Sequence, residues 1–220
     1  MRALEDLVTA GKVRFLGFSD SPAWKVAQAQ VTALLQGRTP LVALQIPYSL
    51  LERTVEGELI PMARELGLGV TPWGALASGV LSGKYTRADA AQAQPRRGTL
   101  VTEALTESTF RLMDILNDVA GQLETTPSRV ALAWVHSRPA VASTIIGART
   151  LEQLEDNLGA LDLRLTSEHL ARLEEASRPR LNFPAAYLAG IGMHPYGGTT
   201  INGEAFPVSP FAPKTDDERF

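Results

Sequence analysis

Short, almost entirely apolar segments alternate with amphipathic segments along much of this chain. Residues 13–18, 41–46 and 70–73 predict strands, and residues 21–35 and 56–66 predict the helices between them. Strands that are apolar throughout indicate burial on both faces, as in a parallel sheet covered by helices. The predicted strands begin about 28 residues apart, as expected of repeated βα units. The alternation therefore predicts an α/β fold.

The rest of the chain continues this organisation after a long loop. Residues 74–107 contain several glycines and prolines with little periodicity, and loops of this length are usually functional or disordered. The pattern predicts a fourth strand over 142–146, and further helices over 1–10, 108–123, 128–137, 151–161 and 167–176. Beyond residue 178 the chain is rich in Gly, Pro and aromatic residues, which predicts an irregular C-terminal arm.

Composition excludes several classes of partner. The formal net charge of the 220 residues is −3, which provides no basic footprint for nucleic acid or anionic lipid. The chain has no cysteine, so disulfides, thiolate metal sites and cysteine nucleophiles are excluded. Its histidines are too scattered to indicate a metal site, and no apolar run reaches membrane-spanning length. We therefore expect a soluble, cytoplasmic protein that binds neither nucleic acid, membrane nor metal.

The turn after the fourth predicted strand is typical of an anion site. Gly147, Ala148 and Arg149 separate this strand from a helix that carries Gln153 and Asn157 one turn apart. A helix N-terminus presents unpaired N–H groups, its dipole favours negative charge, and arginine adds charged donors. An ordinary strand-to-helix turn with a solvated arginine fits the same spacing. The residues of this turn alone leave both interpretations open.

Four strands allow two parallel architectures. A doubly wound sheet carries its Gly-rich phosphate loop after the first strand, but Gly17-Phe18-Ser19-Asp20 lacks the GxGxxG spacing. A (β/α)8 barrel instead builds its phosphate site after its last two strands, which fits the position of Arg149. A closed barrel needs eight strands, however, and an open four-stranded sheet would leave two unpaired edges.

Several long motifs resemble the C-terminal half of an aldo-keto reductase. Residues 11–20, 44–51, 69–85 and 144–157 are similar, in this order, to the fifth to eighth strand regions of that family, the last through a GARTxxQxxxN segment. The variant over residues 19–24 resembles the branch of aryl-alcohol-dehydrogenase-like enzymes. The resemblance implies a partial (β/α)8 TIM barrel, with strands five to eight and their helices, as the NADP-binding half over residues 1–178. An irregular C-terminal arm would follow over residues 179–220.

The resemblance also implies where a nicotinamide ring would bind. The family holds NADP(H) across the C-terminal ends of its strands, and Ser19 and Gln45 match the residues that hydrogen-bond the carboxamide. Asp20 replaces the usual Asn, so it can accept a hydrogen bond from the amide but cannot donate one. Trp73 alone would suggest core packing, but at this strand end it would stack on the nicotinamide ring.

The phosphates of the cofactor would be held by the two loops that follow the seventh and eighth strand regions. The pyrophosphate would be wrapped by a glycine-rich set, in which glycines allow close backbone approach: Gly74, Leu76, Ser78, Gly79, Leu81, Gly83 and Lys84. Gly147, Ala148 and Arg149 would meet the adenosine 2′-phosphate. Gln153 and Asn157 would reach the phosphate edge and the adenine. The arginine favours NADP(H) over NAD(H).

The family transfers hydride between the nicotinamide and a carbonyl carbon, and a tyrosine assisted by lysine, aspartate and histidine donates the proton. No position here matches those four residues, and we assign no catalytic residue. The resemblance predicts an NADP(H)-dependent oxidoreductase that reduces aldehydes or ketones, aryl ones among them, to alcohols. The chain is expected to be truncated, with the catalytic half absent. The alternative is a non-catalytic NADP(H)-binding half barrel that self-associates through its open edges.

Overall fold

The computed structural model describes residues 1–87, 99–191, 196–201, 203–209, 211–213 and 215. The chain forms two compact units, Met1–Pro179 and Arg180–Phe220, which are described separately. The residues 88–98 of the predicted long loop lie outside the described part.

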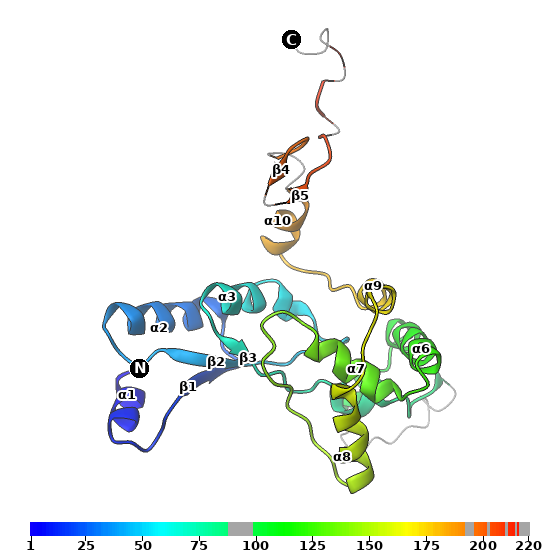
Figure 1. Ribbon diagram of the computed structural model, residues 1–220, viewed down its shortest axis with the longest axis horizontal. Coiled ribbons are helices and arrows are strands. Elements are labelled where there is room, and N and C mark those ends of the chain that lie inside the picture. Colours follow the sequence, from blue (N-terminus) through cyan, green and yellow to red (C-terminus); the bar gives the residue numbers. More distant parts are fainter. Residues whose placement is uncertain (88–98, 192–195, 202, 210, 214, 216–220) are drawn as a thin grey trace. The chain divides into compact units, whose positions relative to one another are not determined.

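The first unit contains a three-stranded parallel sheet, with strand order β1-β2-β3 (Figure 1). Its strands are β1 (Leu16–Ser19), β2 (Leu41–Gln45) and β3 (Gly69–Val70). Ser19 pairs with Gln45, and Leu44 pairs with Val70. Because parallel strands run in one direction, their carboxyl ends meet at the same edge of the sheet. The predicted α/β class with parallel strands is confirmed, whereas the partial barrel stays a prediction.

The prediction of a regular fourth strand over 142–146 is wrong. Val141 forms a single parallel bridge with Val70, and the Ile145 N–H donates to the Pro72 carbonyl at 2.8 Å. The segment is therefore extended and hydrogen-bonded without forming a ladder. The third strand is also shorter than the predicted 70–73, although the Thr71 and Trp73 N–H groups still donate to the Leu44 and Ile46 carbonyls, at 2.9 and 3.0 Å.

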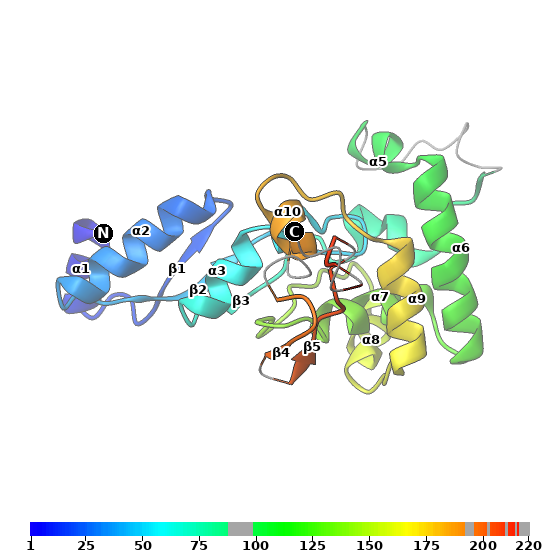
Figure 2. The ribbon, with the colours of Figure 1, turned by 90° about the horizontal axis from the view of Figure 1, so that it is seen from above.

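The helices of the first unit connect and cover the strands, and α2 and α3 lie along one face of the sheet (Figures 1 and 2). Helix α6 packs against both α7 and α9 (Figure 2). The α-helices are α1 (Arg2–Thr9), α2 (Ala23–Leu35), α3 (Leu59–Glu65), α5 (Thr99–Ala104), α6 (Glu107–Gln122), α7 (Pro127–His136), α8 (Leu151–Leu158) and α9 (Ser167–Ala176). Among the helices described, none combines the length and apolar content needed to cross a membrane.

Threonine side chains fix the start of four of these helices. Thr106, Thr126, Thr150 and Thr166 each accept a hydrogen bond from the backbone N–H three residues later. Such caps satisfy an N–H group that has no partner inside the helix. The helix boundaries at α6 to α9 therefore follow from the sequence.

Two regions contain more structure than predicted. The loop over 74–107 includes the 3₁₀ turns of η2 (Ala77–Ser82) and helix α5. The second unit, expected to be irregular, includes helix α10 (Ala185–Ile191) and an antiparallel hairpin of β4 (Thr200–Ile201) and β5 (Glu204–Ala205). These elements are short and locally stabilised, so apolar periodicity over a long window does not reveal them.

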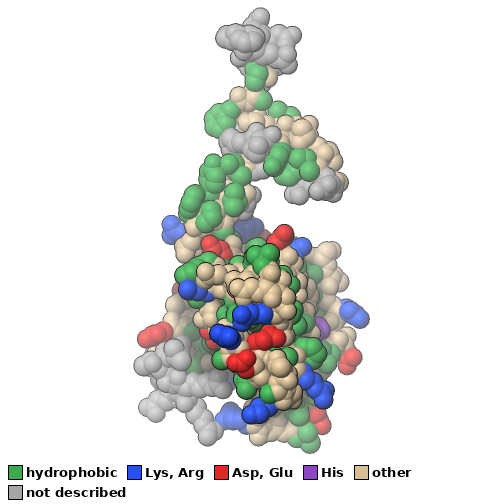
Figure 3. Space-filling view, turned by 90° about the vertical axis from the view of Figure 1, so that its left-hand side faces the viewer, with side chains coloured by type: hydrophobic (Ala, Val, Ile, Leu, Met, Phe, Trp, Pro, Cys, Tyr) green, Lys and Arg blue, Asp and Glu red, His purple; other side chains and the backbone are tan. Residues whose placement is uncertain are grey.

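Charged side chains of both signs are interspersed over the part of the first unit that faces the viewer in Figure 3.

A buried ion cluster joins the 3₁₀ turn η1 (Thr54–Glu56) to α9. Arg53 is 6% exposed and forms two hydrogen bonds with Glu56, at 2.8 and 2.9 Å. Its remaining N–H groups donate to the Ser177 hydroxyl at 2.7 Å and to the Glu174 carboxylate. Burial alone would lower the pKa of Arg53, but these hydrogen bonds outweigh it and the pKa is raised. The guanidinium is therefore fully charged inside the core.

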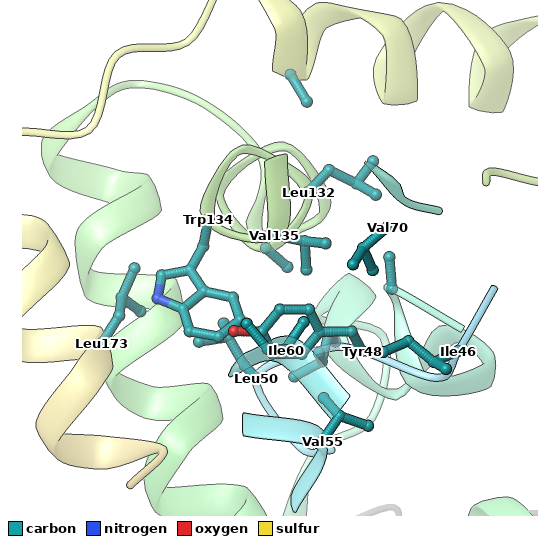
Figure 4. Close-up of a cluster of buried hydrophobic side chains, with 14 of the residues drawn as sticks. Ile46, Tyr48, Leu50, Val55, Ile60, Val70, Leu132, Trp134, Val135 and Leu173 are labelled. Atoms are coloured by element: carbon teal, nitrogen blue, oxygen red, sulfur yellow. The ribbon is translucent and has the colours of Figure 1, made fainter. Parts of the chain in front are cut away.

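An aromatic pair borders this cluster (Figure 4). Trp134 is completely buried, and its ring meets the Tyr48 ring edge-on with centroids 5.6 Å apart. The guanidinium carbons of Arg53 and Arg138 lie over the indole, at 5.0 and 4.7 Å from its centroid. The Tyr48 hydroxyl donates to Glu56 at 2.7 Å. Cation–π contacts and hydrogen bonds thus offset part of the cost of burying these charges.

Candidate functional site

A cavity of about 790 Å³ lies in the first unit between two loops that are distant in sequence. One loop follows β3 and includes η2, and the other leads into α8. The cavity collects most of the predicted phosphate-binding residues: Gly74, Leu76, Ser78, Gly79, Lys84, Gly147, Ala148, Arg149, Gln153 and Asn157. Leu81 and Gly83 belong to the same loop but do not line the cavity. Leu81 is fully buried in the core instead.

The η2 loop follows a left-handed path that places a lysine over a glycine. Ala77, Ser78 and Gly79 all have positive φ angles, of 47°, 59° and 91°. A side chain at Gly79 would place its Cβ 2.8 Å from the Lys84 Nζ. The positive φ favours glycine at this position, and the role of Gly79 in close approach to a pyrophosphate stays a prediction.

Gly79→Ala should lower the free energy of unfolding by about 1 to 2 kcal/mol, because alanine at φ 91° is strained and its Cβ displaces Lys84. Urea denaturation measures the change. The matched control is Gly121→Ala in α6, where a Cβ meets nothing within 4 Å and the helix gains roughly 0.5 to 1 kcal/mol. Changes of the same sign in both variants would contradict the strain at Gly79.

The Arg149 turn is held by the two polar residues predicted to contact the cofactor. The Arg149 N–H donates to the Gln153 Oε1 at 3.0 Å, and the Gln153 N–H donates to the Thr150 hydroxyl at 3.2 Å. Asn157 is buried, and its Nδ2 donates to the Gly147 carbonyl at 3.5 Å. Gln153 and Asn157 therefore stabilise the turn itself, a role that sequence reasoning missed. The Arg149 side chain is exposed at the cavity wall.

The first turn of α7 also borders the cavity, through Ser128. Asp156 lines it as well, and its carboxylate pairs with Arg129 at 2.9 Å and accepts from the Thr126 hydroxyl at 3.0 Å. These contacts tie α8 to the start of α7. The sequence signal near these residues is Thr126-Pro127, which predicts the start of α7. It does not predict that α8 packs against this start.

The ring-binding residues predicted from the sequence meet at the carboxyl ends of the strands. Ser19 and Gln45 are paired in the sheet, and the Asp20 N–H donates to the Gln45 carbonyl at 3.2 Å. The Trp73 indole N–H donates to the Asp20 carboxylate at 3.0 Å, and the Ser19 hydroxyl donates to the same carboxylate at 2.9 Å. Trp73 is 41% exposed, so its ring is available for stacking.

The described tyrosines give no reason to assign a proton donor. Burial raises the pKa of Tyr48 far above its ordinary value, and its hydrogen bond to Glu56 raises it further. A general acid needs a pKa near the working pH, so Tyr48 is a core residue. Tyr85 lines the cavity, whereas Tyr187 and Tyr196 belong to the second unit.

A known family accounts for the motifs at both ends of this site. The model of the Aldo/keto reductase family matches residues 1–178. The chain belongs to the aldo/keto reductase family. Its match begins with α1 and ends just after α9, and it therefore includes the cavity, the strand ends and the buried ion cluster. The resemblance stated from the motifs is confirmed.

Relatives of this aldo/keto reductase chain are named as oxidoreductases. It is 38% identical over 173 residues to the uncharacterized oxidoreductase YrpG of Bacillus subtilis, covering 79% of this chain and 52% of that protein. It is 31% identical to the probable aryl-alcohol dehydrogenase AAD4 of Saccharomyces cerevisiae (86% and 58% covered) and 33% identical to the norsolorinic acid reductase stcV of Emericella nidulans (86% and 47% covered). The chain spans about half the length of these relatives.

Proposed function

We propose that this chain holds NADP(H) for an oxidoreductase that interconverts aldehydes or ketones with alcohols. The observation that carries the proposal is the cavity. Its lining includes Lys84 and Arg149, which come from separate loops, together with Ser78 and the first turn of α7. Ammonium, guanidinium and backbone N–H groups are the donors that phosphate oxygens require. The volume of about 790 Å³ is typical of small-molecule sites.

The residues present fit the parts of this cofactor. Because Gly79 has no Cβ, the Lys84 ammonium lies close to the backbone of a turn suited to a pyrophosphate. Arg149 would bind the 2′-phosphate, which favours NADP(H) over NAD(H). Ser19 and Gln45 would orient the carboxamide, and Trp73 would cover one ring face. The bound cofactor would supply the hydride, and we assign no proton donor to this chain.

Aromatic compounds are the substrates that we favour. Two of the relatives are named for aryl alcohols and for norsolorinic acid. The alternative of a non-catalytic, self-associating half barrel is not favoured, because the relatives are named as oxidoreductases.

The purified chain should bind NADPH and should not oxidise it when benzaldehyde is added, because none of its tyrosines matches the proton donor of the family. Isothermal titration calorimetry measures binding, and the absorbance of NADPH measures turnover. NADH is the control and should bind more weakly, since it lacks the 2′-phosphate. No heat of binding at millimolar NADPH would contradict the proposal. NADPH oxidation that depends on benzaldehyde would show that the chain holds a proton donor.

A further inference from the structure

We propose that Asp20 makes the strand-end site bind the oxidised, cationic nicotinamide ring more tightly than the reduced, neutral ring. The inference rests on the proposed function, which brings the ring to Trp73. It concerns Asp20, which stands where the family usually has Asn.

The carboxylate of Asp20 is a fixed negative charge. Its two oxygens each receive one hydrogen bond, from the Ser19 hydroxyl at 2.9 Å and from the Trp73 indole at 3.0 Å. Both donors are neutral. Within the described part of the chain, Asp20 takes part in no salt bridge. The hydrogen bonds therefore hold the position of the charge without cancelling it.

The indole that would support the ring is held by the same carboxylate. Because the Asp20 Oδ1 lies 3.0 Å from the Trp73 Nε1, any planar ring stacked on this indole lies beside a negative charge. Trp73 is 41% exposed, so one part of its surface is open to such a ring. A site of this kind suits a flat aromatic group that carries a positive charge.

Two physical effects then act in the same direction. The face of an indole attracts a cation more strongly than a neutral ring, and the carboxylate attracts it through the Coulomb term. The nicotinamide rings of NADP⁺ and NADPH differ by one positive charge, whereas the two cofactors carry the same phosphates. The change in the ratio of their dissociation constants when the charge of Asp20 is removed therefore reports the charge at the ring end.

Asp20→Asn removes this charge and keeps the size of the side chain, although its amide nitrogen would donate to the Ser19 hydroxyl instead of accepting from it. The asparagine carbonyl can still accept from the Trp73 indole, and asparagine tolerates the left-handed φ of 48°. We expect the ratio of the NADP⁺ to the NADPH dissociation constant, measured by calorimetry, to rise about threefold to tenfold in the variant. In the unmodified chain, added salt should move the ratio toward the value of the variant.

Asp156→Asn is the matched control, because it removes one negative charge at the opposite part of the site. It should change both dissociation constants alike and leave their ratio unaltered. An unchanged ratio in Asp20→Asn, with both cofactors still bound, would overturn the inference and leave the proposed function intact. An equal loss of affinity for both forms would show that Asp20 only positions Trp73. Failure of the unmodified chain to bind either form would overturn the proposed function and the inference with it.

Discussion

Arg53→Met should lower the free energy of unfolding by about 2 to 3 kcal/mol, because it removes the buried cation that two half-buried carboxylates share. Glu56 and Glu174 would lose the guanidinium that bridges them, and the Ser177 hydroxyl would lose a donor. The methionine side chain fills a similar volume, so the loss would come from charge and not from a cavity. Urea denaturation of the purified chain measures the effect.

The control lies on the same helix. Arg172 of α9 pairs with Asp118 at the surface, and Arg172→Met should cost less than about 1 kcal/mol, because exposed ion pairs contribute little. Adding Glu56→Gln to Arg53→Met should restore part of the stability, since it neutralises one stranded carboxylate. Equal losses in the Arg53 and Arg172 variants would contradict the importance of burial.

Arg149→Ala should weaken the binding of NADPH about tenfold to a hundredfold, which corresponds to the loss of a charge-assisted hydrogen bond to phosphate. The binding of NADH should change little, because it lacks the 2′-phosphate. Calorimetry of both cofactors with both proteins gives the four dissociation constants. The free energy of unfolding should change little, because the Arg149 side chain is exposed and the turn is held by its backbone N–H.

Arg149→Lys separates charge from geometry. Lysine keeps the positive charge but cannot offer the planar pair of donors. The affinity of the Arg149→Lys variant for NADPH should therefore lie between those of the unmodified chain and of Arg149→Ala. An equal loss of NADPH and NADH affinity in Arg149→Ala would place the arginine away from the 2′-phosphate.

The sequence predicts the parallel sheet and its helices well because both depend on local patterns. Apolar runs such as 41–46 indicate buried strands, and Thr126 followed by Pro127 marks the start of α7. The fourth strand over 142–146 was predicted wrongly because its apolar composition says nothing about its neighbour. That neighbour includes Pro72, which cannot donate to a ladder, and so regular pairing stops.

The site could be predicted in outline but not in its internal contacts. Motif order places Lys84 and Arg149 on two loops, and the structure brings both loops to one cavity. The hydrogen bond from Trp73 to Asp20 joins residues far apart in sequence, and no spacing rule predicts such a pair. The same is true of Asp156 and Arg129, whose ion pair depends on how α8 packs against α7.

The ion cluster around Arg53 also bears on how this chain is made. Its partner Glu174 follows 121 residues later, so during synthesis the arginine leaves the ribosome long before the helix that supplies its second carboxylate. At the usual rate of translation this interval is on the order of 10 s. Until α9 emerges, β2, η1 and α7 can pack together only without the Glu174 carboxylate beside Arg53. We therefore expect α9 to complete this polar centre only after the other elements have left the ribosome.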